Sequence, residues 1–146
     1  MLSQDFSEFV ALLNQHKVEY LIVGGYAVTV HGYPRYTGDL DVWIKADKET
    51  AIKMMQVLEE FGFGALGLQK QDFLEPEAVV QLGYPPVRID ILTYIDGVTF
   101  AECYPQKVVL DIEGLLVDFI SLPDLLKNKI SSGRTRDLND LENLTE

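Results

Sequence analysis

Two aspartates separated by one residue stand at the start of a predicted buried strand. Asp39 and Asp41 occur in the run "GDLDVWI", although aspartate is among the residues least suited to strand interiors. Because side chains alternate along a strand, both carboxylates project from one face, about 7 Å apart. A third aspartate, Asp90, lies in the predicted strand "VRIDIL" and joins that face if the two strands pair.

This cluster indicates metal-dependent chemistry. Neighbouring carboxylates repel and raise one another's pKa unless a cation lies among them. Ligation by oxygen atoms alone favours Mg²⁺ or Mn²⁺ over zinc. Two such ions can hold a nucleoside triphosphate in line with an attacking hydroxyl group, one activating the nucleophile and the other neutralising the leaving pyrophosphate.

A glycine pair supplies the second requirement of such chemistry. Gly24 and Gly25 follow the apolar segment at residues 20–23 and precede a predicted helical turn. Without a Cβ atom in the way, their backbone N–H groups can approach phosphate oxygens closely.

Each feature also has an explanation that needs no ligand. The glycine pair can be a tight strand-to-helix turn, the Asp-x-Asp pattern the polar start of an ordinary strand, and Asp90 the ion-pair partner of Arg88. A soluble α/β domain whose carboxylates are surface features therefore stays open. The conjunction of all three, in this order, is much harder to attribute to chance.

The elements that must position these residues follow from hydrophobic periodicity. Helices are predicted over residues 4–16 with Ser3 as N-cap, 26–33, 47–61, 121–132 with Ser121 as N-cap, and 135–144, which carries Leu138, Leu141 and Leu144. Strands are predicted over residues 19–25, 39–45 and 78–93, the last region holding two strands joined through "GYPP". A hairpin over residues 107–120 is predicted to turn at Glu113 and Gly114.

The third helix is expected to face inward through Ile52, Met55, Val57 and Leu58 and to end at Gly62. Residues 63–76 favour a loop with one helical turn. The resulting order predicts an α+β (mixed α/β) domain with one mixed β-sheet flanked by helices and a short C-terminal helical tail. At 146 residues, the chain fits one domain, residues 1–146.

Composition limits the partners. The single cysteine and two histidines cannot form an internal disulfide or a structural zinc site, which favours a reduced, cytoplasmic setting. No signal peptide is visible, and the longest uncharged stretch is too interrupted by glycine to span a membrane. The formal net charge of -11 works against long-range capture of nucleic acid or of an anionic membrane.

Basic residues nevertheless gather near the C-terminus. They are Lys127, Lys129, Arg134 and Arg136, four of the 12 Lys and Arg residues. One explanation is local: the lysines complement the end of a helix dipole and the arginines are solvated. The alternative is a binding spot for an anionic group.

The run "GGYAVTVHGYPRYTGDLDVWI" resembles the minimal nucleotidyltransferases of the DNA polymerase beta superfamily, in which a Gly-Gly or Gly-Ser turn precedes a D-x-D strand. "RIDIL" matches the third aspartate of that pattern. The tail "LKNKISSGRTRDLNDLENL" is similar to the closing motif of the bacterial branch that contains MNT-like proteins and the AbiEii-type abortive-infection toxins. The resemblance covers nearly the whole chain and implies the nucleotidyltransferase fold.

Carried across residue by residue, the resemblance implies that Asp39, Asp41 and Asp90 ligate Mg²⁺ or Mn²⁺ and that Asp90 helps to deprotonate the acceptor hydroxyl. It also implies NTP contacts from Gly24, Gly25, Arg35, Thr37, Lys129 and Arg134. Asp137 and Asp140 match acidic positions of the tail, where they either orient those bases or cap and solvate the last helix.

The chain also departs from the superfamily pattern. Many members have serine after the first glycine, but here Gly25 follows Gly24, which leaves the phosphate contact to the backbone. No added acceptor-binding domain is visible, so the acceptor site would need a homodimer or an antitoxin-like partner protein.

The leading interpretation is a nucleotidyltransferase of the EC 2.7.7 type that moves a nucleoside monophosphate from an NTP to a hydroxyl group. The acceptor classes left open are tRNA, which would suit a toxin-like role, a protein, and a small molecule such as an antibiotic. The alternative is a non-catalytic protein of this fold that binds nucleotide or a partner protein.

Overall fold

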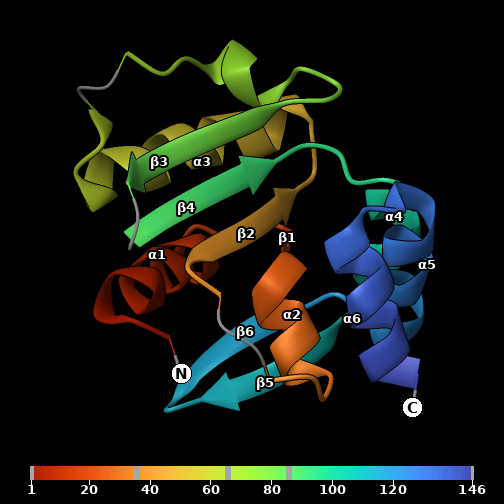
Figure 1. The fold of residues 1–146 in the computed structure, drawn as a ribbon. Helices are drawn as coiled ribbons and strands as arrows, with labels where there is room; N and C mark the ends of the chain where they lie inside the picture. The colour runs from red at the N-terminus through yellow and green to blue at the C-terminus, as the bar shows by residue number, and fades with distance from the viewer. Residues whose placement is uncertain (1, 35–36, 65–66, 85–86, 146) are drawn as a thin grey trace.

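A computed structural model describes residues 2–34, 37–64, 67–84 and 87–145. Within these ranges the strands form one mixed sheet in the order β3-β4-β2-β1-β6-β5, with helices on either side (Figure 1). The strands are β1 (Tyr20–Val23), β2 (Asp39–Ile44), β3 (Val79–Tyr84), β4 (Val87–Leu92), β5 (Val108–Ile112) and β6 (Leu115–Phe119). The α-helices are α1 (Gln4–Gln15), α2 (Gly24–Val30), α3 (Lys48–Phe61), α4 (Phe100–Cys103), α5 (Leu122–Ser132) and α6 (Thr135–Thr145), and the 3₁₀ turns are η2 (Lys70–Phe73) and η3 (Tyr104–Gln106). The predicted fold class is confirmed.

The aspartate-bearing strands are neighbours at the middle of the sheet. Strand β2 pairs parallel with β4 on one side and antiparallel with β1 on the other. Strand β1 in turn pairs parallel with β6, while β3 and β5 form the antiparallel edges. The carboxyl ends of β1 and β6 and the amino ends of β2 and β4 therefore meet at one edge of the sheet.

The register of β2 and β4 places their acidic side chains on a common face. Asp41 lies opposite Asp90, and Asp39 lies opposite Arg88. Because directly paired residues share a face, both carboxylates of β2 lie on the same side as that of β4. The predicted alternation is confirmed, since Leu40 and Val42 are fully buried while the two aspartates between and before them are only partly buried.

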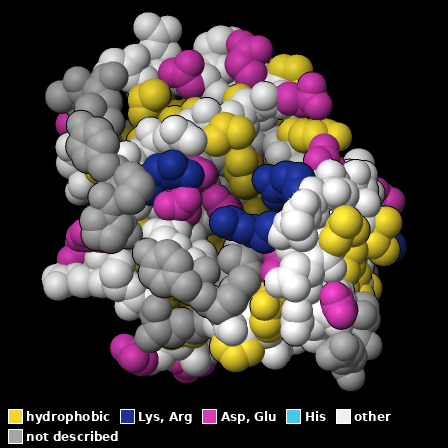
Figure 2. Space-filling view, viewed as in Figure 1, with side chains coloured by type: hydrophobic (Ala, Val, Ile, Leu, Met, Phe, Trp, Pro, Cys, Tyr) yellow, Lys and Arg dark blue, Asp and Glu magenta, His cyan; other side chains and the backbone are white. Residues whose placement is uncertain are grey.

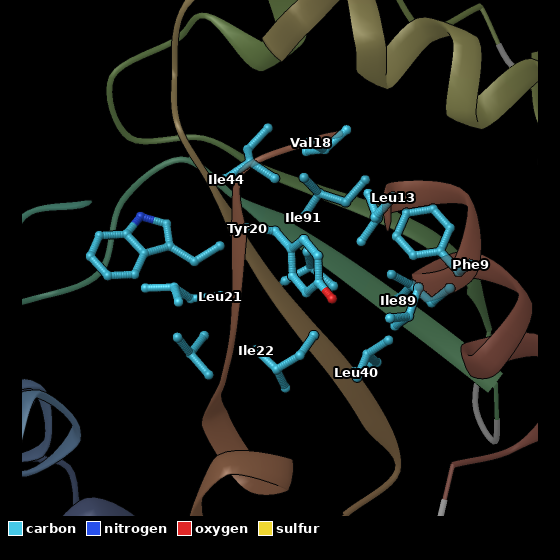
Figure 3. Packing of buried hydrophobic residues seen from close by; sticks show 14 of the residues in the cluster. Phe9, Leu13, Val18, Tyr20, Leu21, Ile22, Leu40, Ile44, Ile89 and Ile91 are labelled. Atoms are coloured by element: carbon cyan, nitrogen blue, oxygen red, sulfur yellow. The ribbon is translucent and has the colours of Figure 1, made fainter. Parts of the chain in front are cut away.

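The opposite face of the sheet carries the main core. Phe9 and Leu13 of α1 pack against Ile89 and Ile91 of β4, with the side chains of β1 and β2 alongside (Figure 3). Full burial of each such side chain contributes about 1.5–3 kcal/mol to folding. This packing fixes the sheet against α1 and leaves its other face for Asp39, Asp41 and Asp90.

Several helix and turn boundaries follow the predicted local chemistry. Ser3 and Ser121 cap α1 and α5 through hydrogen bonds from backbone N–H groups. Gly62 ends α3 in the left-handed conformation. Glu113 and Gly114 both have positive φ and form the predicted turn between β5 and β6.

The buried sides of two helices differ from the sequence pattern. In α3, Ile52 is 49% exposed and Met55 is only partly buried, whereas Ala51 and Met54 are fully buried. The prediction for Val57 and Leu58 is confirmed. In the first half of the helix, however, the buried side chains lie one position before the expected ones. The sequence pattern favours the larger apolar side chains over alanine, but the orientation of the helix against its neighbours decides which side chains are buried.

The leucine spacing in α6 does not mark its buried side. Leu138 is 55% exposed, while Asp137 and Asp140 have no exposed surface. Helix α6 therefore packs on α5 through acidic side chains, which requires cations in the interface. Another small difference concerns α2, which begins at Gly24 itself rather than after the glycine pair.

No helix in the part of the chain that the structure describes combines the length and the apolar character needed to cross a bilayer.

Candidate functional site

A cavity of about 420 Å³ lies over the face of the sheet that carries Asp41 and Asp90. Acidic and basic side chains gather around a hollow on this face of the molecule (Figure 2). Its walls come from the β1–α2 junction, β2, β3, β4 and the loop after it, helix α5, and Arg134 between α5 and α6. The described lining residues are Val23, Gly24, Asp41, Val79, Asp90, Leu92, Tyr94, Ile95, Asp96, Asn128, Lys129, Ser132 and Arg134.

Asp41 and Asp90 form the acidic wall of this cavity. They are direct partners in the β2–β4 register, and Asp90 is only 7% exposed. Burial, followed by repulsion from Asp90 and Asp39, raises the pKa of Asp41 to about 7. Burial also raises the pKa of Asp90, although Arg88 acts in the opposite direction. The pair therefore favours either a shared proton or a bound cation.

Arg88 bridges the third carboxylate, Asp39, to Asp90. Its Nη2 donates to Asp39 Oδ2 at 2.6 Å and to Asp90 Oδ2 at 3.2 Å. Its Nε lies 3.2 Å from Asp90 Oδ1, an ion-pair contact whose angle does not make a hydrogen bond. The guanidinium group thus lies between Asp39 and Asp90.

Gly24 touches the acidic wall from the other side. Its φ is +67°, and a Cβ atom added there would lie 2.0 Å from Asp41 Oδ2. No side chain larger than hydrogen fits between the start of α2 and this carboxylate. The backbone of residue 24 therefore approaches Asp41 directly, where a Cβ atom would prevent it, while contacts of the glycine pair with phosphate stay a prediction.

Lys129 lies on the opposite wall, on α5, and is almost fully buried. Its Nζ donates to Asp137 Oδ1 at 2.9 Å and lies 3.2 Å from Asp140 Oδ2. Both carboxylates come from α6 and are fully buried. Of the two roles left open for them, the structure supports orientation of the basic side chains, because Asp137 and Asp140 fix the ammonium group of Lys129 beside the cavity.

Arg134 belongs to the same ionic cluster but reaches solvent. Its Nε donates to Asp137 Oδ2 at 2.7 Å, and Ser132 Oγ donates to the same oxygen. Burial acts to raise the pKa of Asp137. The hydrogen bonds from Arg134, Ser132 and Lys129 nevertheless hold that pKa well below its usual range. The side chain of Arg134 is 74% exposed, so its outer nitrogen atoms can still contact a ligand in the cavity.

The donor set fits a hard divalent cation, with one rearrangement. Asp41 and Asp90 offer only oxygen ligands, and the buried Asp90 Oδ1 lacks a hydrogen-bond donor. As the side chains stand, however, the described residues contain no group of three or more His, Cys, Asp or Glu side chains gathered closely enough to hold a metal ion. Asp39 completes such a group only if it leaves Arg88.

The other predicted site residues are placed differently. Gly25 is buried within α2, and Thr37 Oγ1 donates to Asp39 O at 3.4 Å; neither is among the described residues that line the cavity. Arg35 lies outside the described residues.

Sequence reasoning missed part of the cavity wall. Tyr94, Asp96 and Asn128 line the cavity but belong to no pattern that would have singled them out. Asn128 and Ser132 lie one helical turn apart on α5 and flank Lys129, so their helical spacing could have placed them near it.

Solved structures share this fold at low sequence identity. A candidate nucleotidyltransferase from Thermotoga maritima, TM1012, has a TM-score of 0.61 and 15% identity, with 94% of this chain and 88% of that chain covered. The antigenic nucleotidyltransferase-like protein from Paracoccidioides brasiliensis has a TM-score of 0.56 and 21% identity, with coverage of 98% and 77%. The lincosamide antibiotic adenylyltransferase LnuA, solved with lincomycin, has a TM-score of 0.56 and 16% identity, with coverage of 100% and 98%.

No curated protein matches the chain in sequence. One family does: its description is "Nucleotidyltransferase of unknown function (DUF6036)", and the match covers residues 2–145. Because that match includes nearly every position, the chain belongs to this nucleotidyltransferase family.

Proposed function

We propose that this protein is a metal-dependent nucleotidyltransferase that moves a nucleoside monophosphate from an NTP to a hydroxyl group and releases pyrophosphate. One observation carries the proposal. Asp41 and Asp90, paired across parallel strands, face a cavity of about 420 Å³ that is bounded by the Gly24 backbone on one side and by Lys129 and Arg134 on the other.

The acidic wall would bind the metal and receive the proton. Asp41 and Asp90, joined by Asp39, would hold Mg²⁺ or Mn²⁺, which when bound supplies charge neutralisation and lowers the pKa of the attacking hydroxyl. The hydroxyl oxygen forms a bond to the α-phosphorus as the bond to the pyrophosphate oxygen breaks. Asp90 takes the hydroxyl proton in our proposal, and its raised pKa suits that role.

The opposite wall would hold the triphosphate. The backbone N–H group at Gly24 and the cations of Lys129 and Arg134 would contact phosphate oxygens, while a contact from Gly25, which does not line the cavity, stays a prediction. Asp137 and Asp140 would keep Lys129 in place while they neutralise part of its charge. Roles for Arg35 and Thr37 toward the triphosphate stay predictions.

Among the acceptor classes, we favour a small molecule. Two of the four basic residues near the C-terminus, Lys129 and Arg134, are already paired with Asp137. With a net charge of -11, little positive surface is left for an RNA backbone. A cationic hydroxyl compound is attracted to such a protein, and two structural neighbours are LnuA bound to lincomycin and ANT(2'')-Ia bound to adenylyl-2''-tobramycin. The predicted tRNA or protein acceptor, toxin role, homodimer, antitoxin-like partner and cytoplasmic location stay predictions.

A second candidate function has one specific observation in its favour. Arg88 already neutralises Asp39 and Asp90 without any metal. A chain in which that ion pair persists with nucleotide present would bind NTP without transferring it.

Label transfer separates the two candidates. The purified chain is incubated with each α-labelled NTP, Mg²⁺ or Mn²⁺, and pools of aminoglycosides, lincosamides, tRNA or lysate proteins. Our proposal expects metal-dependent transfer to a small-molecule pool, abolished by Asp41→Asn. The matched control, Asp5→Asn, makes the same chemical change at an exposed position of α1 and should transfer at the wild-type rate.

Metal-dependent NTP binding without transfer to any pool would favour the non-catalytic alternative. Neither binding nor transfer, or full activity in Asp41→Asn, would refute the proposed function.

A further inference from the structure

We propose that Arg88 is a built-in counter-cation that binds two of the carboxylates proposed to hold the metal, Asp39 and Asp90, and must release them before a divalent ion can bind. This inference rests on the proposed function, because it concerns the same carboxylates. It makes Arg88 a positioning residue that controls how tightly these carboxylates bind the metal.

The ion pairs of Arg88 follow from the strand register. Arg88 lies directly opposite Asp39 on the parallel neighbour β2, and Asp90 follows two positions later on the same face of β4. One guanidinium group therefore reaches both carboxylates, through Nη2 at 2.6 Å and 3.2 Å and through Nε at 3.2 Å.

The same oxygen atoms cannot serve both cations well. Asp39 Oδ2 and both oxygens of Asp90 face the guanidinium group. A divalent ion shared by Asp41 and Asp90 would lie within a few ångströms of that positive charge and would be repelled by it. This competition explains why three aspartates on one face do not form a gathered three-carboxylate site as the side chains stand.

Arg88 has room to move. Its side chain is 29% exposed, and that of Asp39 is 34% exposed, so both can rotate toward solvent. Asp90, at 10%, is held more firmly. Metal binding would therefore release Arg88 and turn Asp39 toward Asp41 and Asp90, while Asp90 stays in place.

The test is metal affinity measured without nucleotide. Mn²⁺ binding is followed by electron paramagnetic resonance for the wild type, Arg88→Met and Arg88→Lys. Loss of a charge-assisted contact of this kind changes an affinity about tenfold or more, so Arg88→Met should bind Mn²⁺ at least about tenfold more tightly than the wild type, with Arg88→Lys between them.

Two controls make the result specific. Lys45→Met removes the same charge at an exposed site, where Lys45 pairs with Glu19 and Asp47, and should leave the Mn²⁺ affinity within about twofold of the wild type. If Arg88→Met does not fold, the inference can still be tested on the wild type by nuclear magnetic resonance. Mg²⁺ should shift the ¹⁵Nε resonance of Arg88 and speed the exchange of its Nε proton with water.

The outcomes separate this inference from the proposed function. Wild-type chain that binds Mn²⁺ and transfers label, with equal or weaker Mn²⁺ binding in Arg88→Met and an unchanged Arg88 resonance, overturns the role of Arg88 alone. No Mn²⁺ binding by the wild type or by any variant overturns both.

Discussion

Replacement of Gly24 by alanine tests whether the close approach of the backbone to Asp41 builds the site. An alanine Cβ would lie 2.0 Å from Asp41 Oδ2, and contacts below 3.0 Å do not persist, so the carboxylate must move by about 1 Å. Displacement of a reacting group by that distance costs about 100-fold in rate. We therefore expect Gly24→Ala to reduce label transfer by about two orders of magnitude.

The same substitution should also lower the free energy of unfolding. Residue 24 has a φ of +67°, and a left-handed conformation costs about 1–2 kcal/mol for a residue with a Cβ atom. Forcing the Asp41 side chain off its preferred rotamer adds about 0.5–1.5 kcal/mol. Together these terms predict a loss of about 1.5–3.5 kcal/mol, measured by urea unfolding without metal.

Gly133 supplies a matched control, because its φ of +63° is nearly the same while an added Cβ atom would meet nothing nearer than 4.0 Å. Gly133→Ala should lose only the backbone part, about 1–2 kcal/mol, and should transfer within about threefold of the wild type. If Gly24→Ala matches Gly133→Ala in both stability and transfer, the contact with Asp41 does not build the site.

Three other perturbations have defined outcomes. Without metal, the free energy of unfolding should fall as the pH rises from about 4 to about 7, because folded Asp41, with its pKa raised from 3.8 to about 7, keeps a proton that the unfolded chain has released. Asp41→Asn should flatten this slope in urea unfolding. An unchanged slope would contradict the raised pKa of Asp41. Lys129→Met should cost roughly 3 kcal/mol in the same assay, because Asp137 and Asp140 are both left buried without its ammonium group, and Asp137→Ala should cost less, because Asp140 still pairs with Lys129; the reverse order would contradict this ion cluster. Filter binding at physiological salt should retain no tRNA, whereas a micromolar complex that weakens steeply with salt would restore RNA as an acceptor.

The site could be predicted from sequence where strand geometry alone decides it. The alternation of side chains placed Asp39 and Asp41 on one face, and parallel pairing of β2 and β4 brought Asp90 beside them. The helix caps Ser3 and Ser121 could also be predicted from local sequence, because each cap needs only one side chain and one nearby backbone N–H group. The alternation and the caps need only neighbouring residues, whereas the position of Asp90 also needs the pairing of β2 with β4.

What the sequence did not predict depends on packing between distant elements. Ala51 is buried in place of Ile52 because the orientation of α3 against α1 and η2 decides which side faces inward. The burial of Asp137 requires Lys129 from another helix. The pairing of Arg88 with Asp39 requires the β2–β4 register, which neither strand specifies by itself.

The parallel pairing of β2 and β4 also bears on the order of folding. The contact of Arg88 with Asp39 joins positions 49 apart in the chain, and α3, η2 and β3 must fold between them. Contacts of such separation close late, because loop entropy opposes them until the intervening segments are compact. A truncated chain that ends before β4 can pair β1 with β2 but lacks Asp90, so under our proposal we expect it to bind no divalent ion.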